Sequence, residues 1–185
     1  MPAIRPIDVR GLGAVVLVIV ATIVVACGTT EVPGRSLPVE SVGPGRTVSP
    51  AVNQTRIELA RALGAHNLVL GDSQAPIRPA EAPLFAGAPR AVYQVLLPKD
   101  PSKGFVVVYE FADSDRAAAA AAQEQAYLAT GPGRVQTPLG SVSIIRQVGS
   151  TVVFYEWLPE GSLDDSAPGI QAALETVGVA FPVPS

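Results

Sequence analysis

The sequence has almost no cysteine or histidine, which excludes several kinds of site. Cys27 is the only cysteine and His66 the only histidine. A chain with one cysteine forms no disulfide within itself, so the folded part must be stable from packing alone. A metal site would have to be built from carboxylates, and a histidine-based triad has a single candidate. Because His66 follows the end of a predicted helix, we interpret it as a structural or solvated residue.

Familiar catalytic motifs are also missing. The sequence contains no P-loop, no dinucleotide-binding glycine fingerprint, no G-x-S-x-G, no H-E-x-x-H and no C-x-x-C. Four aspartates carry oxygen atoms that calcium accepts, but they lack the spacing of a calcium-binding loop and suit helix starts better: Asp113, Asp115, Asp164 and Asp165. The sequence therefore predicts no catalytic residues, no metal site and no cofactor.

Basic residues are in the minority. The chain has 13 lysines and arginines against 16 aspartates and glutamates, a net charge of −3 at pH 7. A mildly acidic chain lacks the positively charged surface that binds nucleic acids and anionic bilayers. We therefore expect no nucleic-acid partner.

The most prominent feature that is present is an uncharged apolar run, residues 11–26, which follows Arg5 and Arg10. A basic segment, an apolar segment and a small residue before a cleavage point are the parts of a secretory signal peptide. The run ends in a motif that resembles the lipobox of bacterial lipoproteins, Val24-Val25-Ala26-Cys27. This resemblance implies that the chain is cut after Ala26 and that Cys27 carries the lipid, with palmitate among its acyl chains.

Two other interpretations of this run stay open. The first is an ordinary secretory signal. The second is an uncleaved membrane helix, although the run is shorter than the ~20 residues that span a bilayer. With a lipobox, residues 1–26 are a signal peptide, and the mature chain keeps 11 basic and 15 acidic residues, a net charge of −4. Lipid would then hold it on the extracytoplasmic side of the cell membrane, inner or outer. Residues 27–53, rich in Pro, Gly, Ser and Thr, are expected to be anchor and flexible tether, and residues 54–182 a single domain.

Beyond the tether, strand and helix patterns alternate. Thr55 and Glu58 form a capping box that predicts a short helix over residues 56–63. Further helices are predicted from Ser114 to about Thr130 and from Pro168 onward. Runs of β-branched and aromatic residues predict four strands, Ala91–Leu97, Phe105–Phe111, Ser141–Val148 and Thr151–Trp157. A short strand is allowed at Leu68–Leu70.

Two of these strands nearly repeat each other. Residues 106–111 read VVVYEF and residues 152–157 read VVFYEW. Each closes a hairpin and leads into a helix, so the chain reads ββα–ββα with a period of about 46 residues. Two such units predict an α+β fold with a four-stranded antiparallel sheet, permuted relative to the ferredoxin-like arrangement. Two helices would cover one face, an extra helix would precede them, and the repeated strands would be the central pair.

Alternation along the repeated strands assigns their side chains to two faces. We expect an aromatic-rich face to lie beneath the helices, against the alanines of residues 117–122. The second face is expected to hold Val106, Val108, Glu110, Val152, Phe154 and Glu156. Left bare, it would be a large apolar patch, which monomers seldom expose. The sequence leaves open whether the N-terminal helix, a second copy of the domain or another partner, or a ligand covers it.

The predicted function follows from these features. We expect a lipid-anchored cell-envelope protein whose non-catalytic domain binds a ligand or a partner through the second face. One alternative is a carboxylate-based hydrolase that uses Glu110 and Glu156 as an acid and base pair. The other alternative is an accessory subunit of an envelope complex.

Overall fold

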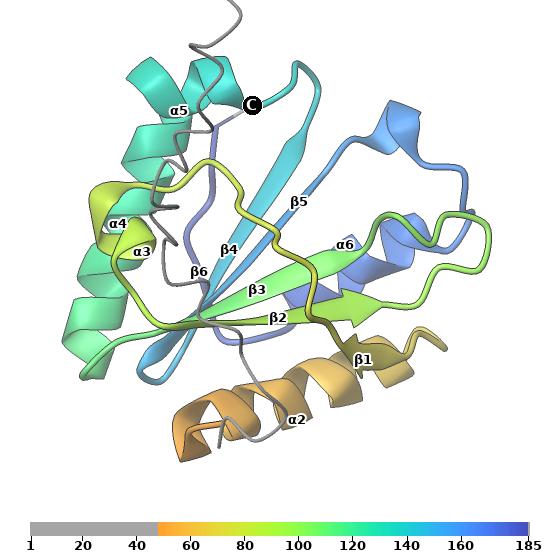
Figure 1. Ribbon diagram of the computed structural model, residues 1–185, viewed down its shortest axis with the longest axis horizontal. Coiled ribbons are helices and arrows are strands. Elements are labelled where there is room, and N and C mark those ends of the chain that lie inside the picture. Colours follow the sequence, from red (N-terminus) through yellow and green to blue (C-terminus); the bar gives the residue numbers. More distant parts are fainter. Residues whose placement is uncertain (1–47, 185) are drawn as a thin grey trace, which may run out of the picture. The chain divides into compact units, whose positions relative to one another are not determined.

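Six strands form one antiparallel sheet in the computed structural model, which describes residues 48–184 (Figure 1). The strand order is β1-β2-β3-β5-β4-β6. The strands are β1 Leu70–Asp72, β2 Arg90–Val95, β3 Phe105–Glu110, β4 Val142–Val148, β5 Thr151–Trp157 and β6 Val179–Ala180. The central pair is β3 and β5, the two strands that repeat each other in sequence.

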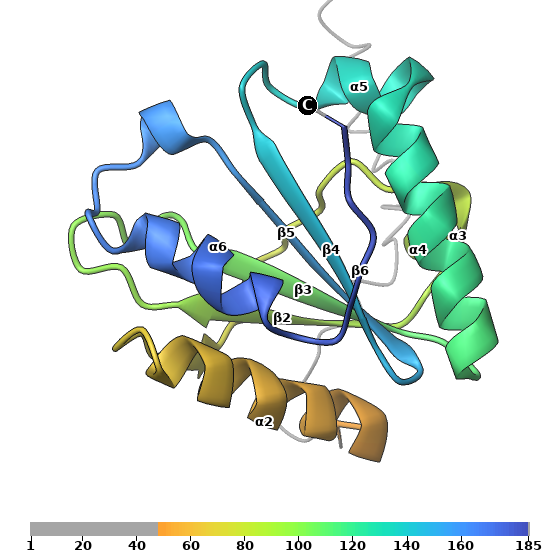
Figure 2. The same ribbon diagram turned by 180° about the vertical axis from the view of Figure 1, so that it is seen from behind.

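Helices lie on both faces of this sheet. The described residues form five α-helices, α2 Pro50–Gly64, α3 Pro83–Ala86, α4 Ser114–Ala129, α5 Gly131–Gln136 and α6 Ala167–Glu175. A short 3₁₀ helix, η2, spans Pro159–Gly161. Seen from behind, α2 and α6 lie side by side over one face, while α4 flanks the other (Figure 2). No helix of residues 48–184 has both the length and the apolar character that crossing a membrane requires.

The first core lies between the sheet and helices α2 and α6. From the central strands it takes Val106, Val108, Val153 and Tyr155, all at most 2% exposed. The two helices supply Leu59, Leu63, Ile170 and Leu174, all completely buried. A hydrogen bond of 2.7 Å between the buried hydroxyls of Thr55 and Thr151 joins α2 to the start of β5.

The second core lies on the opposite face, beneath α3 and α4. It contains Val107, Tyr109, Val152 and Phe154 from the central strands. The side of α4 that meets them is made of small residues, Ala117, Ala120 and Ala121, which are completely buried. Small side chains let the helix approach closely to the bulky residues of the strands. The buried side of the alanine run is therefore a packing surface, whereas Ala119 and Ala122 are exposed.

The four-stranded fold prediction is wrong. The sheet has six strands in place of four, and helices cover both of its faces. The two extra strands are short edge strands: β1 has 3 residues and β6 has 2. Segments of this length are too short to show alternation. The short strand allowed at Leu68–Leu70 overlaps β1 at Leu70 only, and β6 was not predicted. The four longer strands and the α+β class are present, with strand ends within two residues of those predicted.

Helix α2 begins earlier than the capping box predicts. Ser49 is its N-cap, and the Ser49 hydroxyl accepts a hydrogen bond from the backbone N–H of Val52. Thr55 lies inside the helix, where its side chain is 1% exposed and bonds to the carbonyl of Ala51 and to Thr151. The helix thus includes residues 50–53, which the sequence assigned to the tether.

The hairpin between β4 and β5 has a two-residue turn. Val148 pairs with Thr151, so that Gly149 and Ser150 form the connection. Gly149 has a φ of 56°, in the region that glycine adopts without steric cost. For helix α4 the predicted cap is also present, because the Asp113 carboxylate accepts a hydrogen bond from the backbone N–H of Arg116 at 2.7 Å.

Candidate functional site

The six residues assigned to one face of the sheet are divided between two faces. Val107 pairs with Phe154 and Val108 with Val153, and residues that pair directly across antiparallel strands share a face. Val106 and Val108 therefore lie beneath α2 and α6, whereas Val152 and Phe154 lie beneath α3 and α4. The prediction of a single apolar face is wrong. Its error is a register shift of one residue, which moves side chains to the opposite face.

Glu110 and Glu156 do not form a pair. Glu110 lies opposite Thr151, the first residue of β5, whereas Glu156 is the next-to-last residue of that strand. The two positions are about 17 Å apart along the strand direction. They also lie on opposite faces, since Glu110 follows Val106 and Val108 and Glu156 follows Val152 and Phe154. The structure therefore separates the two carboxylates that the hydrolase alternative requires.

Glu156 instead lines a cavity of about 290 Å³ at the end of the central strands. The cavity lies where β3 begins and β5 ends. Its walls come from the hairpin loop between β2 and β3, from the connection between β5 and α6, and from the segment before β4. A further part comes from the chain that links β1 to β2 and crosses the sheet. Its lining includes Ile77, Pro79, Phe105, Val107, Pro138, Ser141, Phe154, Glu156, Trp157 and Ser162. The volume is at the small end of the range for small-molecule sites.

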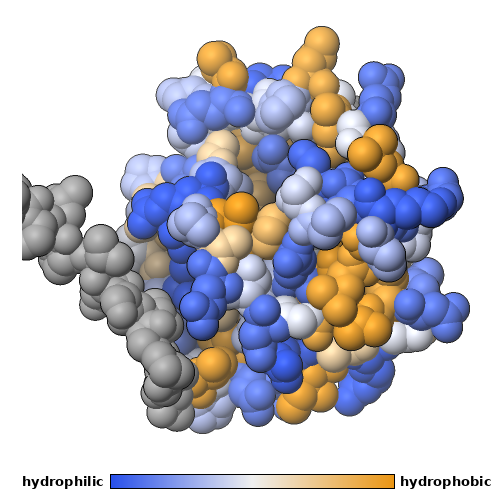
Figure 3. Space-filling view, turned by 45° about the vertical axis from the view of Figure 1, so that its right-hand side comes forward, coloured by the Kyte–Doolittle hydropathy of each residue, from blue (hydrophilic) through white to orange (hydrophobic). Residues whose placement is uncertain are grey.

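The surface on this side of the molecule is mixed in character. In Figure 3, which brings the right-hand side of Figure 1 forward, hydrophobic side chains occur in separate groups between hydrophilic ones. Two leucines of the loops that flank the cavity are strongly exposed, Leu139 at 91% and Leu163 at 74%. The cavity, rather than a broad apolar surface, is therefore the feature of this side that points to a ligand.

Glu156 is the only acidic residue in the cavity wall. Its Oε2 atom is buried and has no hydrogen-bond partner. Burial raises the pKa of the Glu156 carboxyl above its ordinary value. No lysine or arginine of the described residues lies within ion-pair distance of it. A buried oxygen without a partner is costly, and most buried polar groups in natural structures have one.

A second carboxylate, Glu124, belongs to helix α4 and lies within electrostatic reach of Glu156. It is completely buried, and its Oε2 atom accepts a hydrogen bond of 2.7 Å from the backbone N–H of Ala82. Its Oε1 atom has no partner. Burial, together with the negative charges of Glu81 and Glu156, raises the pKa of Glu124 to about 7, against the opposing effect of the Ala82 bond.

The sequence analysis missed Glu124, although a signal was present. The buried residues of α4 are Ala117, Ala120, Ala121, Glu124 and Leu128. They recur at intervals of three and four residues, so they form one stripe of the helix. An acidic residue in an otherwise apolar stripe indicates a buried carboxylate, and this stripe can be read from the sequence.

Residues 73–89, which we call the strap, contribute Ile77, Arg78 and Pro79 to the wall of the cavity. The strap, yellow to yellow-green in Figure 1, links β1 to β2 in the chain and crosses the sheet on the way. Glu81 fixes its middle, with Oε1 accepting hydrogen bonds from Arg90 at 2.6 Å and from the Tyr109 hydroxyl at 2.7 Å. Burial and the bond to Glu81 raise the pKa of Tyr109. The neighbouring bond from Ala82 to Glu124 attaches the strap to α4 as well.

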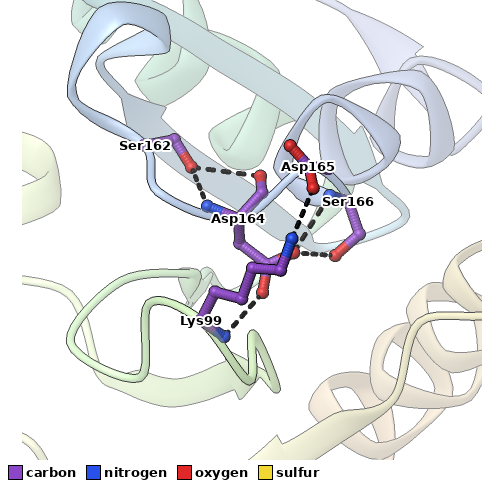
Figure 4. Close-up of polar contacts among 5 residues, drawn as sticks. All are labelled: Lys99, Ser162, Asp164, Asp165 and Ser166. Carbon is purple, nitrogen blue, oxygen red and sulfur yellow. Dashed lines mark hydrogen bonds and ion pairs between the residues drawn. The ribbon is translucent and has the colours of Figure 1, made fainter.

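The two loops on the opposite side of the cavity hold each other through aspartates (Figure 4). The Asp164 carboxylate accepts hydrogen bonds from the backbone N–H groups of Lys99 and Ser166 and from the Ser166 hydroxyl. The Ser166 hydroxyl and these N–H groups lower the pKa of Asp164. An exposed ion pair between Lys99 and Asp165 lies beside them. The cavity is thus enclosed by segments that polar contacts fix in place.

Other predicted positions are outside this region. Ala26 and Cys27, the predicted cleavage point and lipid attachment site, lie outside the described residues. In the part of the chain that the structure describes, no three side chains among His, Cys, Asp and Glu are arranged to hold a metal ion. A comparison with protein families finds no family model that matches the chain, and comparisons with curated proteins and with solved structures find no match either.

Proposed function

We propose that this protein is a lipid-anchored domain of the cell envelope that binds a small molecule, without converting it, in the cavity around Glu156. The observation that carries the proposal is Glu156, whose carboxylate stands in the wall of a cavity of about 290 Å³ and whose buried Oε2 atom has no hydrogen-bond partner. A ligand that donates a hydrogen bond to this carboxylate would give it a partner. The apolar side chains around it would exclude water from the contact.

The rigidity of the cavity supports binding. Glu81 and Glu124 fix the strap, and Asp164 joins the two loops on the other side. A site whose walls are fixed before the ligand arrives loses little conformational entropy on binding. Polar contacts that would be costly to break thus hold the shape of the cavity.

The composition of the wall favours binding over two-carboxylate hydrolysis. Glu156 is the single carboxylate in the lining, and Glu110 is on the opposite face of the sheet. Hydrolysis of a glycosidic bond by an acid and base pair needs two carboxyl groups that flank the substrate. Glu124 is completely buried and binds backbone, so it is placed to hold the strap.

The anchoring part of the proposal is carried by the sequence. The basic residues, the apolar run and the lipobox-like motif that ends in Cys27 support export and attachment through lipid on Cys27. The membrane is then a partner through the lipid alone, and the acidic composition favours no nucleic-acid partner. The binding domain would face the extracytoplasmic space, where it meets small molecules of the envelope.

Native mass spectrometry of the protein, purified gently from its own membranes, tests the proposal. We expect a part of the protein to carry a small adduct. Ser141→Phe, which fills the cavity, should remove the adduct. Ser114→Phe, at an exposed position outside the cavity lining, is the matched control and should keep it. An adduct that persists in Ser141→Phe would place the ligand elsewhere, and a wild-type protein of bare mass would contradict binding at this cavity.

A further inference from the structure

The chemistry around Glu156 also indicates what kind of ligand the cavity takes, given the proposed function on which this inference rests. The surrounding wall is apolar on the strap and on the central strands, at Ile77, Pro79, Val107 and Phe154. The one acidic group in it, the Glu156 carboxylate, is an acceptor of hydrogen bonds that no residue of the described chain pairs with. A fitting ligand therefore has a compact apolar body and a hydrogen-bond donor that faces Glu156.

The carboxylates near Glu156 determine which kind of hydrogen-bond donor the cavity favours. Glu124 lies close enough to Glu156 for the charge of Glu156 to raise its pKa, and Glu81 acts on it in the same direction. Glu81 has Arg90 at 2.6 Å as its own counter-ion, whereas no cation of the described residues pairs with Glu124 or Glu156. The Glu156 carboxylate thus has no counter-ion, so the part of the cavity beside it repels carboxylate and phosphate groups and attracts cations.

The cations in the wall do not cancel this field. Arg78 has a side chain that is 66% exposed and lies 3.7 Å from Glu81. Lys103 is an exposed residue of the loop between β2 and β3. Water and salt screen exposed charges, whereas buried charges keep most of their interaction. The partly buried Glu156 therefore governs the charge preference of the cavity.

We propose that the cavity binds a small primary amine in its protonated form, with a compact apolar body, and that Glu156 binds the ammonium group. An ammonium group donates a hydrogen bond to the carboxylate and also neutralises it. An alcohol or an amide donates a hydrogen bond but leaves the charge uncompensated. Charge-assisted hydrogen bonds are shorter and roughly twice as strong as neutral ones.

Three probes of nearly equal shape test this assignment: cyclohexylamine, cyclohexanol and cyclohexanecarboxylate. Each is titrated near neutral pH by ligand-observed NMR against the full chain in micelles of an uncharged detergent. We expect the amine to bind at least about tenfold more tightly than the alcohol, and the carboxylate to bind more weakly than either. Glu156→Gln should abolish the preference for the amine, while cyclohexanol should still bind.

The variants are chosen so that the outcomes separate. Glu156→Gln keeps the shape of the side chain and removes a buried charge without a partner, so the fold should persist. Glu160→Gln, at an exposed residue of η2, is the matched control and should keep the preference for the amine. Equal affinities for amine and alcohol, or a preference that survives in Glu156→Gln, would overturn the amine assignment and leave the proposed function standing. Failure of all three probes to bind would contradict both.

Discussion

Asp100 and Asp164 each accept a hydrogen bond from the backbone of the loop to which the other belongs. The Asp164 carboxylate accepts from the N–H of Lys99 at 2.9 Å, and the Asp100 carboxylate accepts from the N–H of Leu163 at 3.4 Å. Both aspartates are largely buried, Asp164 at 7% exposure and Asp100 at 5%. This reciprocal contact joins the loop between β2 and β3 to the loop before α6, and these loops form one side of the cavity.

Asp164→Ala should therefore loosen that side of the cavity and lower the melting temperature. The substitution leaves the N–H groups of Lys99 and Ser166 without their acceptor. Asp165→Ala is the matched control, because it removes only an ion pair between side chains that are 64% and 90% exposed. Thermal unfolding followed by circular dichroism compares the two. An equal effect of both variants would contradict the anchoring role of Asp164.

The lowered pKa of Asp164 adds a dependence on pH. A carboxyl with a lower pKa in the folded state binds fewer protons there than in the unfolded chain. Its contribution to stability is therefore complete above the ordinary aspartate pKa and is lost as the pH falls through the lowered pKa of the folded state. Unfolding measured at acidic pH should show a smaller difference between wild type and Asp164→Ala than unfolding at neutral pH.

Glu124 should have the opposite dependence on pH. Its pKa is raised from 4.5 to about 7 in the folded state, so the folded chain holds a proton that the unfolded chain releases. The free energy of unfolding should fall as the pH rises from about 4.5 to about 7, by about 3 kcal/mol from this group. Glu124→Gln removes the titrating group but keeps an oxygen for the N–H of Ala82, and should flatten the profile.

Chemical denaturation across this pH range measures the effect of Glu124. Glu160→Gln, on the exposed residue of η2, is the control and should follow the wild-type profile. If Glu124→Gln kept the full slope, the buried carboxyl would not be its source.

The hydroxyls of Thr55 and Thr151 offer a test of how α2 is placed on the sheet. Both side chains are buried, and their oxygens are 2.7 Å apart. Each also bonds to a backbone carbonyl, Thr55 to Ala51 and Thr151 to Val148. Replacing either residue with Val should cost about 1 kcal/mol, and a double-mutant cycle should show that the two effects are coupled. Strict additivity of the two substitutions would show that the contact between helix and strand contributes nothing.

The alanine surface of α4 should tolerate enlargement on one side only. Ala120 is completely buried against the central strands, whereas Ala122 is exposed. Ala120→Leu should lower the free energy of unfolding by about 1–3 kcal/mol, because the core beneath α4 has no room for the added carbons. Ala122→Leu adds the same group to solvent and should change stability little. Urea unfolding of both variants measures the difference.

The sequence contains most of the information on the longer elements. Residues 151–157 are rich in β-branched and aromatic side chains, so the bounds of β5 follow directly from the composition of this run. Asp113 marks the start of α4 because its side chain caps the helix. The repeat of β3 in β5 also places these two strands at the centre of the sheet. These features depend on neighbouring residues, which a single sequence displays.

Register and burial depend on distant residues, and there the prediction failed. The repeat suggests that Val106 and Val152 share a face, but Val107 pairs with Phe154, and this shift sends them to opposite faces. The cavity around Glu156 joins the strap to loops more than fifty residues away in the chain, which no local pattern shows. Glu124 lay within reach of sequence analysis, because its place in the apolar stripe of α4 is a local feature.

Cys27→Ser tests the proposed anchor, whose residues lie outside those that the structure describes. The lipid attaches through sulfur, so a serine at this position cannot accept it, and the signal peptidase that acts after lipidation should leave the precursor uncut. Fractionation and intact-mass spectrometry should therefore show either an unprocessed precursor or a soluble product without lipid. Ser36→Cys combined with Cys27→Ser is a control, since it restores a thiol without restoring the motif and should behave like Cys27→Ser alone. A correctly cut protein that stays in the membrane without Cys27 would contradict attachment through lipid, because no acyl chain would remain to hold a net-acidic domain at the bilayer.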